Sequence, residues 1–129
     1  MRRKILAVMM VVAFGIVSLM GNSTVQAKKK TQTPAMVIAN HYYGSAYASI
    51  TSSNAAASTS FGSPIVQTGV SAVYRYKKAN GSLVKMNKSA SGKQTCSVAL
   101  SHSNAYSVIS DHTASCSEGS SKKHIEIVY

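Results

Sequence analysis

The sequence predicts an all-β protein, a small antiparallel β-sandwich of about six or seven short strands preceded by a cleaved signal peptide. Three observations support this prediction. A basic N-terminus is followed by an uncharged apolar run, the rest of the chain alternates apolar and polar side chains with a period of two, and that part shows no helical stripe. The chain has 129 residues, which is the length of a single domain.

The N-terminus has the three-part layout of a secretory signal peptide. Residues 2–4 are basic, residues 5–20 carry no charge, and Val25 and Ala27 mark a cleavage site before Lys28. A retained membrane anchor is the alternative, but the apolar run is shorter than the ~20 residues that span a bilayer. No second apolar run of that length follows. We therefore expect an extracellular product that has no membrane span after cleavage.

The predicted organisation is a signal peptide over residues 1–27, a flexible basic lead-in over 28–40 and a β-sandwich domain over 41–129. The stretch from Lys28 to Pro34 is basic and polar and ends on proline, which is typical of a linker. Removal of the leader would leave 102 residues with a net charge of +8. Large apolar residues are few in this part, so the core should be thin and a cross-link would help it.

Cys96 and Cys116 are the only cysteines. An even pair in an exported chain predicts a disulfide bond, with two free thiols as the alternative. Closing the 21-residue loop between them would contribute about 3 kcal/mol of stability. No CxxC pair is present, so a thioredoxin-type redox role has no support.

Period-two alternation places the expected strands, and clusters of Ser, Asn and Gly place the turns between them. Apolar or small side chains such as Ala46, Ala48 and Ile50 share one face of each expected strand. Gly69 is a candidate bulge position. The expected strands cover residues 43–50, 54–61, 65–77, 95–101, 105–116 and 124–129, with turns over 87–92, 101–104 and 118–123.

The stretch Ala79–Gly81 is the strongest turn signal in the chain. A two-residue turn would pair Tyr76 with Lys85, whereas a three-residue loop pairs Tyr76 with Val84. A slip of one residue inverts every side chain of a strand, so burial should select the register that brings apolar residues together. We expect the three-residue loop, with Gly81 in the left-handed conformation and Arg75 facing solvent opposite Lys85.

Basic residues gather on and beside this hairpin. The chain has 14 basic and 3 acidic residues, and no acidic residue occurs before Asp111. Such a patch attracts anions, and exposed tyrosines add stiff contact area. A solvated face, with lysines that block edge pairing and tyrosines that cover the core, is the alternative. The candidate binding patch consists of Arg75, Lys77, Lys78, Lys85, Lys88, Tyr43 and Tyr47.

Little in the sequence indicates catalysis or metal binding. Ser110, Asp111 and His112 are consecutive, but on a strand Asp111 and His112 point to opposite faces and cannot orient each other without a bulge. The carboxylates and histidines have no spacing typical of a glycosidase or a metal site. These residues are Asp111, Glu118, Glu126, His41, His102, His112 and His124. We expect a protein that is not an enzyme and has no catalytic residue, cofactor or metal ligand.

Three segments rich in Ser, Ala and Tyr resemble small secreted β-sandwich proteins of Gram-positive bacteria, among them the lactococcin-like bacteriocins that interfere with cell-wall assembly. These segments are Ala46–Thr51, Val70–Tyr76 and Ser97–Leu100. The resemblance implies an exported sandwich and an antibacterial role, and it transfers no functional residue.

The favoured function is a secreted, cationic, non-catalytic protein that binds an anionic cell-wall or membrane-surface component. A bacteriocin-like antibacterial toxin and a structural or matrix module without envelope affinity are the alternatives. Export makes genomic nucleic acid an unsuitable partner.

Overall fold

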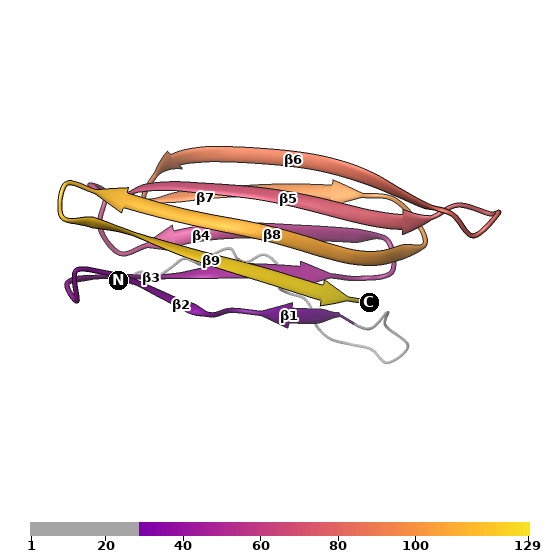
Figure 1. Cartoon of the computed structure of the whole chain (residues 1–129), viewed down its shortest axis with the longest axis horizontal. Coiled ribbons are helices and arrows are strands. Elements are labelled where there is room, and N and C mark those ends of the chain that lie inside the picture. Colours follow the sequence, from indigo (N-terminus) through magenta and orange to yellow (C-terminus); the bar gives the residue numbers. More distant parts are fainter. Residues whose placement is uncertain (1–28) are drawn as a thin grey trace.

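A computed structural model of the protein describes residues 29–129, which form an antiparallel β-sandwich (Figure 1). Within this range the chain has nine strands and no helix, so the predicted fold class is confirmed. The predicted signal peptide and its cleavage site lie outside the described residues.

The first sheet has the order β1–β3–β4–β7, and β2 continues along the same edge of β3 as β1. The second sheet has the order β6–β5–β8–β9. All neighbouring strands are antiparallel. The strands of the first sheet are β1 (Lys30–Gln32), β2 (Ala35–Ile38), β3 (Tyr42–Ile50), β4 (Asn54–Phe61) and β7 (Thr95–Ser101). The strands of the second sheet are β5 (Gln67–Lys77), β6 (Leu83–Lys93), β8 (Ala105–Cys116) and β9 (Gly119–Val128).

Gln94 forms the corner at which the chain passes from β6 in the second sheet to β7 in the first. It adopts a positive φ of 69°. Its amide donates to the carbonyl of Val66 at 2.8 Å, and its carbonyl accepts from the amide of Phe61 at 2.8 Å. These two hydrogen bonds connect Gln94 to the segment in which the chain crosses from β4 to β5. Both crossings between the sheets are therefore joined at this end.

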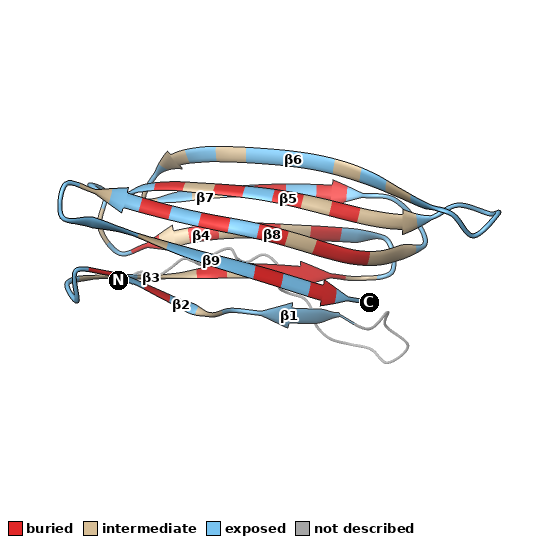
Figure 2. Ribbon diagram, viewed as in Figure 1, coloured by how far each residue is buried: buried red, intermediate tan, exposed pale blue. Residues whose placement is uncertain are grey.

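The core lies between the sheets and consists of the inward half of each alternating strand (Figure 2). Alanines at Ala46, Ala48, Ala55 and Ala57 fill the middle of the first sheet, and all four are buried. Small residues there let the two sheets pack closely although large apolar residues are few. Tyr74 is the largest fully buried side chain in the described part of the chain.

The predicted hairpin register is confirmed. Tyr76 pairs with Val84, and Arg75 pairs with Lys85. The loop closes through Lys78, whose amide donates to the carbonyl of Ser82 at 2.8 Å. Gly81 has a φ of 89°, the left-handed conformation that glycine adopts without strain.

The sequence underestimated how far the strands extend. The predicted turn over 87–92 is wrong, because β6 runs through it and pairs with β5 along its whole length. The predicted turn over 118–123 is wrong for residues 119–123, which belong to β9. Backbone pairing with a neighbouring strand outweighs the turn preference of Ser, Asn and Gly at these sheet edges.

The prediction of a flexible lead-in over 28–40 is wrong for β1 and β2. Met36 and Ile38 on β2 are 2% and 1% exposed, so this strand contributes to the core. Pro34 lies between the two strands, and its carbonyl accepts from the amide of Ala46 at 3.0 Å. Two buried apolar side chains separated by one residue anchor the segment against β3.

The bulge predicted at Gly69 lies elsewhere. Gly69 pairs without interruption with Ser91 and Thr113. The register shifts instead at Arg75 and Tyr76, which face Ser107 and Ala105, so Tyr106 is the additional residue on β8. Glycine at position 69 instead avoids a steric clash, because a Cβ there would lie 2.6 Å from Oγ1 of Thr113.

The predicted disulfide is wrong for this structure, because Cys96 and Cys116 are both free and not close to each other. Cys96 pairs with Thr59 on the first sheet, and Cys116 ends β8 on the second. Thr59, the pairing partner of Cys96, contacts His112 of β8 across the core. Cys116 lies four residues beyond His112 on β8, about 13 Å from it. A disulfide needs Cα atoms closer than ~7 Å.

We expect both thiols to react with iodoacetamide once the unreduced protein is unfolded. In the folded protein the reaction should be slow, because both side chains are half-buried and burial raises the pKa of the Cys96 thiol. Mass spectrometry of the alkylated protein counts the labels. A product that takes up no label until it is reduced would contradict the structure.

Tyr74→Phe should lower the free energy of unfolding by about 1–2 kcal/mol, because the buried hydroxyl donates to the carbonyl of His102. Tyr43→Phe is the matched control: its hydroxyl donates to the carbonyl of Asn40 at 3.0 Å, but the side chain is exposed. Urea denaturation should show a loss for the first variant and almost none for the second. Equal losses would refute a special role for the buried bond.

Candidate functional site

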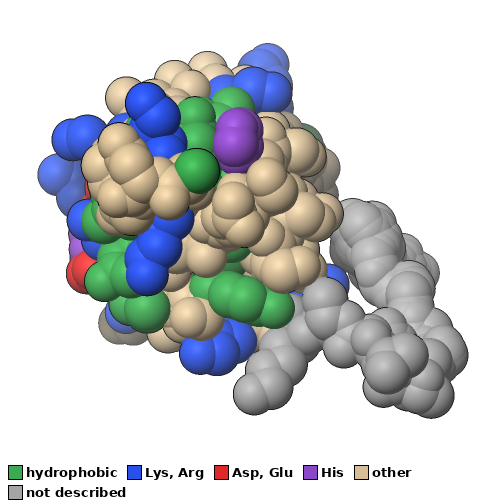
Figure 3. All heavy atoms as spheres, turned by 90° about the vertical axis from the view of Figure 1, so that its right-hand side faces the viewer, with side chains coloured by type: hydrophobic (Ala, Val, Ile, Leu, Met, Phe, Trp, Pro, Cys, Tyr) green, Lys and Arg blue, Asp and Glu red, His purple; other side chains and the backbone are tan. Residues whose placement is uncertain are grey.

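Charge is distributed very unevenly between the two outer faces of the sandwich. The strands β2, β3, β4 and β7 of the first sheet contain no Lys, Arg, Asp or Glu. The second sheet carries charged residues on every strand, and they fall mainly on its outer face because the inner face is packed against the core. Figure 3 shows Lys and Arg side chains spread around the hairpin end of the molecule, with hydrophobic side chains between them.

Arg75 and Lys77 lie on the same outer face of β5 and share one aromatic ring. The Arg75 guanidinium carbon lies 5.3 Å from the centroid of the Tyr106 ring, and Lys77 Nζ lies 5.5 Å from it. Both distances are in the range of cation–π contacts. Arg75 Nε also donates to Ser107 Oγ at 2.9 Å. The β8 bulge thus places Tyr106 beneath two cations.

Lys85 completes this group, because it lies directly across the strand pair from Arg75. We call Arg75, Lys77, Lys85 and Tyr106 the basic cluster. Like charges facing each other on a sheet are destabilising, and a carboxylate would normally neutralise them. Among residues 29–129 the only ion pair within 4.0 Å joins Asp111 and His124, so no carboxylate pairs with the cluster.

A depression of about 380 Å³ adjoins the basic cluster at the hairpin end of the sandwich. The rings of Tyr76 and His102 stack there, with centroids 3.6 Å apart and planes 15° apart. Lys77 and Lys78 line its side, together with Asn104. The depression therefore combines an aromatic surface, two ammonium groups and an amide, and it is continuous with the cluster through Lys77.

The structure does not bring the remaining predicted patch residues together with these. Lys88 lies opposite Ala72 and so points toward the inner side of the edge strand β6 while staying exposed. Such an inward-pointing lysine blocks pairing of a sheet edge. Tyr43 and Tyr47 lie on the outer face of the first sheet, on the other side of the sandwich.

Tyr106 is the member of the site that the sequence did not single out for the patch. A regular β8 would present alternate residues to solvent, and the sequence around Ala105–Ser107 contains no glycine or other bulge signal. Only the pairing of β8 with β5 shows that Tyr106 lies beside Arg75 and Lys77.

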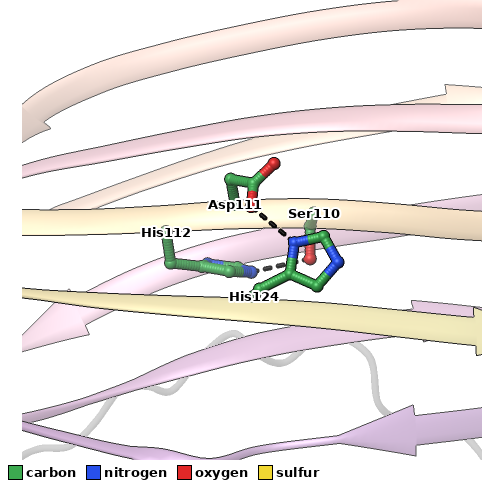
Figure 4. Close-up of polar contacts among 4 residues, drawn as sticks. All are labelled: Ser110, Asp111, His112 and His124. Carbon is green, nitrogen blue, oxygen red and sulfur yellow. Dashed lines mark hydrogen bonds and ion pairs between the residues drawn. The ribbon is translucent and has the colours of Figure 1, made fainter.

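The consecutive residues Ser110, Asp111 and His112 separate onto two faces of β8 (Figure 4). Asp111 faces solvent, and its Oδ1 lies 2.6 Å from Nδ1 of His124. The hydrogen bond and the charge of Asp111 raise the pKa of His124. His112 faces the core, where Ser110 contacts it. The aspartate and the buried histidine therefore do not act on each other as a catalytic pair.

His112 is 1% exposed and belongs to a fully hydrogen-bonded polar group inside the core. Thr59 Oγ1 donates to the carbonyl of Gly69 at 2.9 Å and also contacts Nδ1 of His112 at 2.9 Å. Because the Thr59 proton is used on Gly69, Nδ1 of His112 must donate, and Nε2 accepts from Ser110 Oγ at 2.7 Å. Burial lowers the pKa of His112 to about 4, so the ring is neutral at physiological pH.

Two observations on residues 29–129 concern metal binding and membrane crossing. In this range no three His, Cys, Asp or Glu side chains gather closely enough to hold a metal ion. The range also contains no helix long and apolar enough to cross a membrane. Comparison with family models, curated proteins and solved structures gives no match for the chain.

Acid should destabilise the protein through His112. The unfolded ring titrates near pH 6.5 and the folded ring near 4, so the unfolded state binds more protons between these values. Stability should fall as the pH drops below 6.5, by about 2–3 kcal/mol at pH 4.5. Urea denaturation at pH 7 and pH 4.5 measures the difference.

His112→Gln should abolish most of that acid-induced loss, because the amide can keep both hydrogen bonds without titrating. His124→Gln is the control. In the wild type the raised pKa of His124 stabilises the folded state below pH 6.5, and this stabilisation is lost as the pH rises. His124 therefore acts in the opposite direction to His112. An acid sensitivity unchanged in His112→Gln would exclude His112 as its source.

Proposed function

We propose that the protein is a secreted, non-catalytic binding protein that attaches to an anionic component of a cell envelope through the basic cluster. The observation that carries this proposal is the absence, within residues 29–129, of any carboxylate paired with Arg75, Lys77 or Lys85. Holding three unneutralised cations on one surface costs stability. An external anion would relieve that repulsion.

The shape of the site favours a polymer or a charged surface over a small molecule. The cluster lies on the outer face of paired strands, which hold the backbone positions of its residues at fixed spacing, and the depression beside it is open to solvent. Phosphate or carboxylate groups repeated along a polymer, or in a layer of lipid headgroups, can contact several cations at once. Tyr106 adds an aromatic ring beneath Arg75 and Lys77, and Lys78 extends the basic surface to the hairpin tip.

Arg75→Gln, Lys77→Gln and Lys85→Gln combined should weaken binding to anionic phospholipid vesicles and to isolated bacterial cell walls by about 100-fold at low salt. Each cation near an anionic surface contributes about 1 kcal/mol, and the contributions add. Co-sedimentation at several salt concentrations measures the affinity. Wild-type binding should fall steeply as salt rises, because salt screens exposed charges.

The matched control is Lys93→Gln, Lys122→Gln and Lys123→Gln, which removes the same charge from the opposite end of the second sheet. This control should bind within about threefold of the wild type, since contacts beyond a Debye length of ~10 Å are screened. Equal losses in both triple variants would show that net charge, not the cluster, determines binding. Unchanged binding in the first variant would overturn the proposal.

A further inference from the structure

The wall of the depression beside the basic cluster is a series of aromatic rings that begins in the core. The ring of the buried Tyr74 lies 6.2 Å from the ring of Tyr76, measured between centroids, and the Tyr76 ring stacks on that of His102 at 3.6 Å. Tyr76 is half-buried and His102 is exposed. Figure 3, which faces this end of the molecule, shows a histidine side chain at the surface among hydrophobic and basic side chains. The rings therefore lead from the interior to the surface of the depression.

The loop that joins β7 to β8 is hydrogen-bonded in a way that holds His102 in place. The amide of His102 donates to the carbonyl of Ser53 at 3.0 Å, and the carbonyl of His102 accepts from the hydroxyl of Tyr74. At the other end of the loop the carbonyl of Asn104 accepts from the amide of Lys77 at 2.9 Å. A surface that is ordered before a ligand arrives lowers the conformational cost of binding.

The lining of the depression combines the groups that recognise an acidic sugar. The face of an aromatic ring is negative, so it attracts the weakly positive C–H bonds along one side of a sugar ring. Asn104 offers an amide that both donates and accepts, which suits sugar hydroxyls. Lys77 and Lys78 offer ammonium groups for a carboxylate or phosphate, and among the described residues no carboxylate lines the depression. Its volume of about 380 Å³ is at the lower end of the range for ligand sites.

We propose that the depression holds one sugar unit of an acidic polysaccharide and that the envelope component is such a glycan, an inference that rests on the envelope binding proposed above. The sugar ring packs against the aromatic wall, and its carboxylate or phosphate contacts Lys77 or Lys78. Lys77 also lies over the Tyr106 ring, so one polymer chain can contact the depression and the basic cluster together. Phosphatidylglycerol headgroups and acidic peptides have no sugar ring and would leave the aromatic wall uncovered.

Matched polyanions with and without sugar rings test the proposal. Polygalacturonate and phosphomannan carry carboxylates and phosphates on sugars, whereas polyglutamate and polyphosphate carry the same groups without sugars. Isothermal titration calorimetry of the protein, expressed as the full chain and purified in the form the cell produces, compares them at equal concentrations of anionic groups. At least one sugar polymer should bind about fivefold tighter than its sugar-free counterpart, which is the size of an aromatic contact. The pair with the larger difference identifies the anion as carboxylate or phosphate.

Two variants remove the sugar contacts and leave the basic cluster in place. His102→Ala deletes the exposed ring of the wall and should reduce the preference for the sugar polymer to less than about twofold, while polyglutamate binding stays close to that of the wild type. Asn104→Gly deletes the amide and should also lower the preference, because glycine keeps the positive φ of 64° at this position without strain. Circular dichroism confirms that each variant is folded.

His41→Ala is the matched control and should bind every polymer as the wild type does. It removes an exposed histidine whose ring lies 4.6 Å from that of Tyr42, in the turn between β2 and β3 at the other end of the sandwich (Figure 1).

The outcomes separate a failure of the sugar site from a failure of the proposed function. Equal affinity for polymers with and without sugars would overturn the sugar site and leave anion binding by the basic cluster standing. A preference that His102→Ala leaves unchanged would also overturn the sugar site. No binding to any of the four polyanions or to anionic vesicles would overturn both proposals, and so would equally tight binding of the uncharged polysaccharide dextran.

Discussion

The alternation of side chains along each strand is the constraint on which the structure depends. A residue on a strand faces either the opposite sheet or solvent, and its neighbour faces the other way. The alanines and the few large apolar residues occupy the inner positions. The charged residues on the strands therefore face outward or lie at a sheet edge. Because all charged strand residues except Lys30 lie on the second sheet, the sandwich has one basic outer face and one outer face without charge.

The largest polar group inside the core has its hydrogen bonds made. Thr59, Ser110 and His112 enter the core as one group, which ties β4 to β8 across the sandwich and ends on the carbonyl of Gly69. An unpartnered polar group in that position would cost the full penalty of its lost solvation. The same burial that makes the network stable also keeps the imidazole neutral, so stability and pH response have one physical origin.

The basic face is the surface on which the proposed envelope binding depends. The basic cluster lies on paired strands and beside a bulge, and it is open to an extended anion.

The sequence alone determined the fold class, the alternating faces of most strands and the register at Tyr76 and Val84, because these follow from local periodicity and from one strong turn at Ala79–Gly81. It could not place β1 and β2, extend β6 through a serine-rich stretch or locate Tyr106, because each depends on the neighbouring strand that supplies hydrogen bonds. Which sheet a strand joins was decided only by the tertiary structure. That choice separated Cys96 from Cys116 and the patch tyrosines from the basic cluster, since sequence periodicity fixes which way a side chain points but not which sheet lies beneath it.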